Sequence, residues 1–335
     1  MAGGVGRFKA AHLVWARGAP RAIIMAMRTA LLCFVLTLAA ASAAFGQTAD
    51  PLQRAADAYA SFELDVGAIT AAQMDSYDRM DAALLSAARH DSAELSRGWI
   101  AYAALTAAQS PAFVHGVQSR VRAAGRAPVL QQFMRDTTYA RRRPPGAAEA
   151  LRLMLDTLSA DAVRLSVAAD RYDRLSDAMQ SNSPFGGASD AQRAARDQRL
   201  RAAAAPVLEP EIMQRIHLGP LGAAPMTDAA AFGGAHFWDG LAGLSSTPNA
   251  PMHARDDRQA LTDRMLTLAG LFIIGATPQA NTRVDALLDD RTSRDCLHVQ
   301  QLEFRQCVSV AHTPDEDAAC LARHGLRNVA ACLSF

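Results

Sequence analysis

The chain has 335 residues, of which 50% are hydrophobic and 20% charged, so it can bury one or two hydrophobic cores. Its formal net charge of +1 gives no electrostatic basis for binding nucleic acid or an anionic membrane surface. The alternating pattern of half-buried strands does not occur, whereas capped amphipathic segments recur along the chain. The sequence therefore predicts an all-α protein that binds no nucleic acid.

The first 46 residues predict a targeting segment that is not part of the fold. An apolar run covers residues 29–40, and the small residues that suit a signal-peptidase site follow at 41–46. This pattern is typical of a Sec-type signal peptide, and we expect cleavage before Gln47. An uncleaved anchor is the alternative, but the run is shorter than the ~20 residues that a membrane span needs. We therefore expect no stable membrane span after cleavage.

Export would place the mature chain in the periplasm or outside the cell. A signal peptide normally begins close to its apolar run, so Met25 and Met27 are candidate translation starts besides Met1. Cleavage would also remove Cys33 and leave an even number of cysteines, which suits an oxidising compartment.

Residues 47–205 predict a helical bundle. Asp50-Pro51 has the form of a helix start, and we expect that helix to end near Phe62. A second helix is expected from about Thr70 to His90, and a third, apolar nearly all round, from Asp91. The third helix should lie at the centre of the bundle.

The longest predicted helix covers residues 147–182 and contains no glycine or proline. Apolar and small residues recur along it at alternating steps of four and three residues. Such a seam favours packing within the chain's own bundle over a coiled coil with a partner. Charged residues such as Arg164 and Arg171 are expected on the other faces. The seam consists of Leu151, Leu155, Leu158, Ala162, Leu165, Ala169, Tyr172, Ser176 and Met179.

Residues 206–253 form a glycine- and proline-rich segment that is longer than an ordinary connection. Long irregular segments are usually functional or disordered, and the aromatic residues here argue against simple disorder. A metal or catalytic site can be composed from His217, His236, Asp239 and His253. Their spacing matches no known metal motif, however, so we favour a loop packed on the bundle.

Other catalytic signatures are missing from the sequence. It contains no covalent haem motif, nucleophile elbow, phosphate-binding loop or dinucleotide fingerprint. The pair Asp289-Asp290 lies at a predicted helix edge, where carboxylates usually face solvent or cap the helix dipole. We therefore expect no bound cofactor and favour a non-enzymatic protein.

Residues 254–335 predict a second helical region that ends in a hairpin with four cysteines. Cys296 and Cys307 lie on one predicted helix, about 16 Å apart along its axis. A disulfide needs Cα atoms within about 7 Å, so these two cannot pair with each other. Thr313-Pro314 begins the second arm, Gly325 is expected to end a short helix there, and another turn or two should follow.

Antiparallel packing of the two arms favours one of the three cysteine pairings. It brings Cys320 opposite Cys307 and Cys332 opposite Cys296, so we predict Cys296–Cys332 and Cys307–Cys320. A four-cysteine zinc site or a redox pair is disfavoured, because both normally need cysteines much closer together in sequence.

The sequence thus predicts a disulfide-stabilised helical protein of the cell envelope. A structural or protein-binding module is the favoured function, with an envelope protein as partner. The alternatives are an enzyme or metal protein with its site in residues 206–253, or a bundle that encloses a small apolar ligand. The sequence does not decide the oligomeric state or whether the two helical parts are separate domains.

Overall fold

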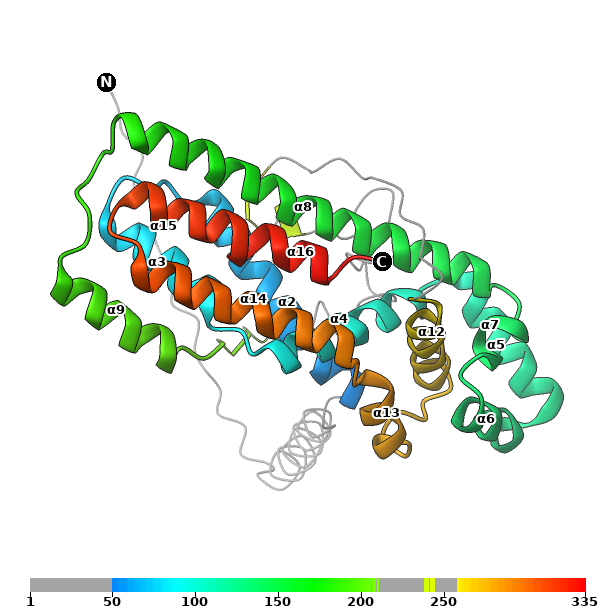
Figure 1. The fold of residues 1–335 in the computed structure, drawn as a ribbon. Coiled ribbons are helices and arrows are strands. Elements are labelled where there is room, and N and C mark those ends of the chain that lie inside the picture. Colours follow the sequence, from blue (N-terminus) through cyan, green and yellow to red (C-terminus); the bar gives the residue numbers. More distant parts are fainter. Residues whose placement is uncertain (1–49, 206, 209, 211–237, 241, 245–257) are drawn as a thin grey trace, which may run out of the picture. The chain divides into compact units, whose positions relative to one another are not determined.

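A computed structural model describes residues 50–205, 207–208, 210, 238–240, 242–244 and 258–335 (Figure 1). In these residues every regular element is a helix, which confirms the predicted all-α class. The predicted signal segment lies outside the described residues. No described helix has both the length and the apolar character needed to cross a membrane.

The helices follow one another through short connections, apart from the break after α9. Their bounds are α2 Pro51–Ala71, α3 Tyr77–Ala88, α4 Ser92–Ala107, α5 Pro111–Ala124, α6 Arg126–Arg135, α7 Tyr139–Arg142, α8 Ala147–Ser181, α9 Asp190–Ala202, α12 Gln259–Ile273, α13 Asn281–Leu288, α14 Arg291–Val310, α15 Pro314–Cys320, η3 Leu321–Arg327 and α16 Asn328–Cys332.

Helix α4 is the centre of the structure, as its apolar sequence predicted. It contacts α2, α8, α12 and α14, and its residues 98–107 are all buried. Gly98 allows α2 to approach closely, because a Cβ atom at this position would lie 2.7 Å from the backbone nitrogen of Tyr59. Asp91 caps α4 by accepting hydrogen bonds from the backbone N–H groups of Ala93 and Glu94.

The predicted boundary between the first two helices was wrong. Helix α2 continues past Phe62 to Ala71, and α3 begins only at Tyr77. Gly67 does not break α2, because it lies where the chain packs tightly: a Cβ there would be 2.9 Å from the Arg164 guanidinium. The guanidinium of Arg171 donates to carbonyl groups at the C-terminal end of α2, including that of Ala72 at 2.7 Å.

Helix α8 has nearly the predicted bounds, and its seam packs inside the same chain. It contacts α4, α15, η3 and α16, and Figure 1 shows it running alongside the C-terminal helices. Seven of the nine seam residues are buried, while Leu151 and Ala162 are partly buried. The stripe therefore joins the first half of the chain to its last forty residues.

The C-terminal hairpin has the predicted cysteine pairing. Cys296 bonds to Cys332 with a Cα–Cα distance of 5.6 Å, and Cys307 bonds to Cys320 with one of 5.7 Å. Thr313 forms the predicted capping box at the start of the second arm. Gly325 does not end the helix, which corrects the prediction. It lies within η3, where its missing side chain makes room for Leu321 and Phe304.

The two disulfides should stabilise the fold to different extents. They close loops of 36 and 13 residues, so the chain-entropy model predicts contributions of about 4 and about 3 kcal/mol. We expect the Cys296→Ala/Cys332→Ala variant to lose more stability in urea unfolding than the Cys307→Ala/Cys320→Ala variant. Thiol titration of the denatured, unreduced mature protein should detect no thiol; four reactive thiols would contradict both bonds.

Candidate functional site

The predicted metal site is only partly within the described residues. His217, His236 and His253 lie outside them. Asp239 is described, and its carboxylate accepts a hydrogen bond from Nε of Arg164 at 2.6 Å. Among the residues that the structure describes, no three metal-ligating side chains are grouped to hold an ion. In the described residues Asp239 is part of an ion cluster in the core.

Arg164 is the centre of this buried ion cluster. It extends from α8, and its second contact is with Glu63 of α2, where Nη1 lies 2.5 Å from the carboxylate Oε2. The same nitrogen donates to the backbone carbonyl of Glu63 at 3.1 Å. The side chains of Arg164, Glu63 and Asp239 are 3%, 0% and 2% exposed. A charge this deeply buried costs several kcal/mol when its partner is missing, so the three segments are tied together.

A third carboxyl group, that of Asp161, lies one turn before Arg164 on α8. The hydroxyl of Tyr59 donates to its Oδ2 at 3.1 Å, and the ring of Tyr102 packs on Tyr59 with centroids 4.8 Å apart. Burial raises the pKa of Asp161 well above that of an exposed aspartate, and the negative charge of Glu63 raises it further. Asp161 therefore holds its proton to a higher pH than an exposed aspartate does.

The ion cluster fixes the short described stretch 238–240 to the bundle. Trp238 is 1% exposed, and its ring lies 6.1 Å from that of Tyr102. Of the aromatic residues expected to pack this loop on the bundle, Trp238 is the one within the described residues, and it does so. None of these residues lines the open cleft described below, so the raised pKa values of Glu63 and Asp161 arise inside the core.

The ion cluster was not predicted from the sequence, although two carboxyl groups inside apolar stripes could have indicated it. Arg164 is expected on a face of α8 away from the apolar seam, and the structure shows that it is buried there as well. Glu63 continues the apolar stripe of Ala56, Tyr59 and Val66 on α2. A carboxyl group inside an apolar stripe indicates a buried ion pair or a protonated acid. Asp161 stands in the same way between Leu158 and Leu165 on α8.

Neutralising Asp161 should change how stability depends on pH. Because its pKa is raised by folding, the stability it contributes is complete below its usual pKa of about 3.9 and is lost as pH rises through the folded-state pKa. We expect the free energy of unfolding of Asp161→Asn, relative to wild type, to increase as pH rises from about 4 to about 8. Urea unfolding across this range measures it.

The control for this experiment is Asp177→Asn, which changes an exposed aspartate on the same helix. Its stability relative to wild type should vary much less over the same range. A difference between Asp161→Asn and wild type that does not depend on pH would contradict the assignment of a protonated Asp161.

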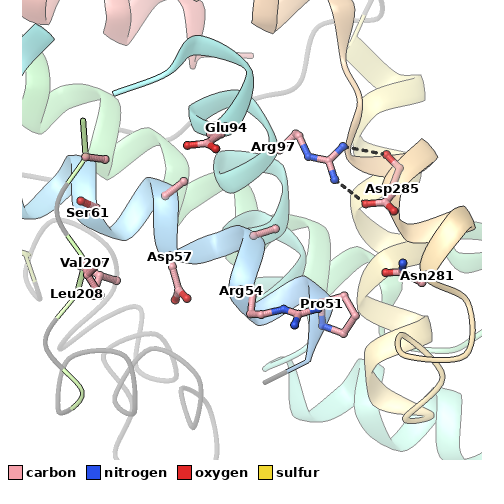
Figure 2. Close-up of a pocket in the computed structure, with 13 residues that line it drawn as sticks. Pro51, Arg54, Asp57, Ser61, Glu94, Arg97, Val207, Leu208, Asn281 and Asp285 are labelled. Carbon is pink, nitrogen blue, oxygen red and sulfur yellow. Dashed lines mark hydrogen bonds and ion pairs between the residues drawn. The ribbon is translucent and has the colours of Figure 1, made fainter. Parts of the chain in front are cut away.

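A cleft of about 610 Å³ opens on the surface between α2, α4 and α13. The short described segment around Val207 forms its other side (Figure 2). This volume is in the range of small-molecule and peptide pockets. Arg97 of α4 pairs with Asp285 of α13 across one end at 2.6 Å. The lining consists of Pro51, Arg54, Ala55, Asp57, Ala58, Ser61, Glu94, Arg97, Ala205, Val207, Leu208, Asn281 and Asp285.

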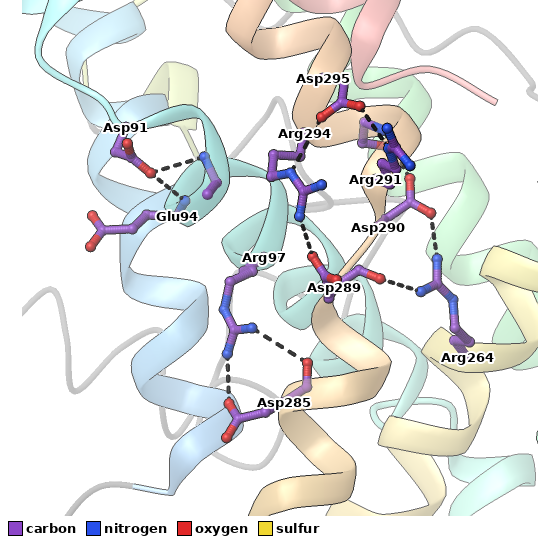
Figure 3. Close-up of polar contacts among 12 residues, drawn as sticks. Asp91, Glu94, Arg97, Arg264, Asp285, Asp289, Asp290, Arg291, Arg294 and Asp295 are labelled. Carbon is purple, nitrogen blue, oxygen red and sulfur yellow. Dashed lines mark hydrogen bonds and ion pairs between the residues drawn. The ribbon is translucent and has the colours of Figure 1, made fainter.

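Two charged side chains of this cleft are unpaired. Among the described residues, the guanidinium of Arg54 and the carboxylate of Glu94 form no ion pair or side-chain hydrogen bond. Figure 3 shows the Glu94 carboxylate apart from the neighbouring ion pairs. Both side chains are exposed and remain available to a ligand.

A second cavity of about 400 Å³ adjoins the first. Glu94 and Ala205 line both, so the two cavities adjoin at the start of α4, and we treat them together as one groove. We call this the α4 groove. Its second part is lined by Arg89, Asp91, Glu94, Ala203, Ala204, Ala205, His298, Gln301 and Arg305.

Ion pairs hold the helices beside the groove in place (Figure 3). Asp290 accepts a hydrogen bond from the backbone N–H of Ser293 at the start of α14 and also pairs with Arg264 of α12. Asp289 pairs with Arg294 at 2.8 Å. The two aspartates therefore cap and crosslink helices, in line with the interpretation from sequence.

Comparison with known proteins gave no matching family model, no matching curated protein and no matching solved structure. The function must therefore be argued from the geometry of the chain itself.

Proposed function

We propose that the mature chain is an exported, non-enzymatic protein that binds a partner protein in the α4 groove. The observation that carries this proposal is the contrast between the groove and the core. The groove is open and bears the charges of Arg54 and Glu94, which have no partner among the described residues, whereas the carboxyl groups of raised pKa, those of Glu63 and Asp161, are enclosed and engaged with protein groups.

Two features support action in an oxidising compartment. The predicted signal peptide would direct the chain out of the cytoplasm and would remove Cys33. The four remaining cysteines are all used in disulfide bonds, which persist outside the cytoplasm and are rare within it. The hairpin is then a stabilising device, and the periplasm or the cell exterior is the proposed location.

Site-specific crosslinking tests the proposed binding site. We expect a photoreactive p-benzoylphenylalanine in place of Val207, which lines the groove and is 92% exposed, to form an adduct with a specific envelope protein. The same amino acid in place of Val167, which is 45% exposed on α8 and lies outside the groove, is the matched control. Adducts are detected by mass spectrometry of the envelope fraction of cells that make the protein.

Two results would contradict the proposal. The first is the same set of adducts from both positions, or none from Val207. The second is a stoichiometric metal ion in the purified mature protein that is lost in His236→Ala, because this would move the functional site to the segment 206–253.

A further inference from the structure

We propose that the α4 groove takes an extended segment of the partner protein in which a basic side chain stands between two acidic ones. This inference rests on the proposed function and adds the chemistry of the partner. It follows from which charges of the groove are already neutralised inside the chain and which are not.

Glu94 provides the negative charge at the middle of the groove. It lines both cavities, and its carboxylate has no partner among the described residues. The backbone N–H groups at the start of α4 do not attract an acidic ligand group to this place, because the Asp91 carboxylate already accepts hydrogen bonds from two of them. Two carboxylates therefore lie at the start of α4, and a basic side chain of the partner fits this place.

Arg54 provides the positive charge in the first cavity. The other guanidinium there, that of Arg97, is neutralised by Asp285 at 2.6 Å. Asp57 also lines this cavity, but it already has an interaction partner. An acidic side chain of the bound segment can pair with the guanidinium of Arg54, which has no partner among the described residues.

Arg305 provides the positive charge in the second cavity. Its neighbour Arg89 is engaged with Asp65, with Nε 2.6 Å from the carboxylate Oδ2. Arg305 itself is partly buried, and its Nε is shielded from solvent without any hydrogen-bond partner. No carboxylate among the described residues pairs with the rest of this guanidinium, so an acidic side chain of a bound segment can pair with it from the cavity that it lines. His298 adds a further donor beside it.

The wall between these charges suits a polypeptide main chain. Ala55 and Ala58 of α2 and the residues 203–205 have small side chains, which let a backbone approach closely. Val207 projects from the opposite side with 92% of its surface exposed and offers an apolar contact. Because positive and negative groups alternate along the groove, a uniformly charged nucleic acid does not match it.

Selection from a random dodecapeptide library tests the charge pattern. The oxidised mature protein is the target, and selected peptides are sequenced and measured by fluorescence anisotropy. We expect selected peptides to share a basic residue with an acidic residue on each side. Arg54→Glu and Arg305→Glu should each lower the affinity of such a peptide by about tenfold or more. Peptides selected against either variant should carry a basic residue in place of one of the two acidic residues.

Matched variants separate recognition from effects on the fold. Glu94→Gln should lower the affinity for the peptide, whereas Glu149→Gln should not, although both glutamates occupy the first turn of a long helix. Arg152→Glu is the control for the two arginines, because Arg152 is exposed on α8 outside the groove.

The outcomes separate this inference from the proposed function. Three results would overturn the inference. The selected peptides could share a pattern without flanking acidic residues, they could still bind both Arg54→Glu and Arg305→Glu, or no peptide could be selected. If Val207 still crosslinks to one envelope protein in any of these cases, the groove remains a binding site and only the charge pattern is wrong. If Val207 gives no adduct as well, both proposals fail.

Discussion

The packing of α2, α8 and the stretch 238–240 depends on the burial of one guanidinium group. Arg164 lies in the core and binds the carboxylates of Glu63 and Asp239, so it joins α2, α8 and the stretch around Trp238. Removing Arg164 would leave two carboxylates without their partner, and removing either carboxylate would leave Arg164 with one of its two, in a medium that solvates charge poorly. The cluster therefore does more than add contacts, because it determines where these three segments must lie relative to one another.

The polar groups of the core differ from those at the surface in whether the protein itself supplies their partners. With Arg164 engaged by two carboxylates, Asp161 has no ion-pair partner of its own, its pKa is raised by burial, and it accepts a hydrogen bond from the Tyr59 hydroxyl. Such enclosed groups suit a structural role. The α4 groove differs, because its charges at Arg54 and Arg305 have no partner within the described residues and remain for a ligand to neutralise.

The sequence predicted those features that follow from local rules. Helix caps, the seam of α8 and the disulfide pairing could be predicted because a cap residue, a repeat or a helix rise determines each of them. The C-terminal end of α2 could not be predicted in this way. Gly67 disfavours a helix by its intrinsic propensity, but in the fold it allows close packing. The burial of Arg164 and the α4 groove arise from segments far apart in sequence, and their contacts are invisible until the chain is folded.

A double-mutant cycle between Arg164 and Asp239 tests the central role of the buried cluster most directly. The free energy of unfolding is measured for Arg164→Met, for Asp239→Asn and for the double variant. We expect a coupling energy of roughly 1–3 kcal/mol, because the second change costs little once the first has broken the pair. Arg171→Met combined with Asp239→Asn should be additive to about 0.5 kcal/mol. Additive effects for Arg164 and Asp239 would contradict the account.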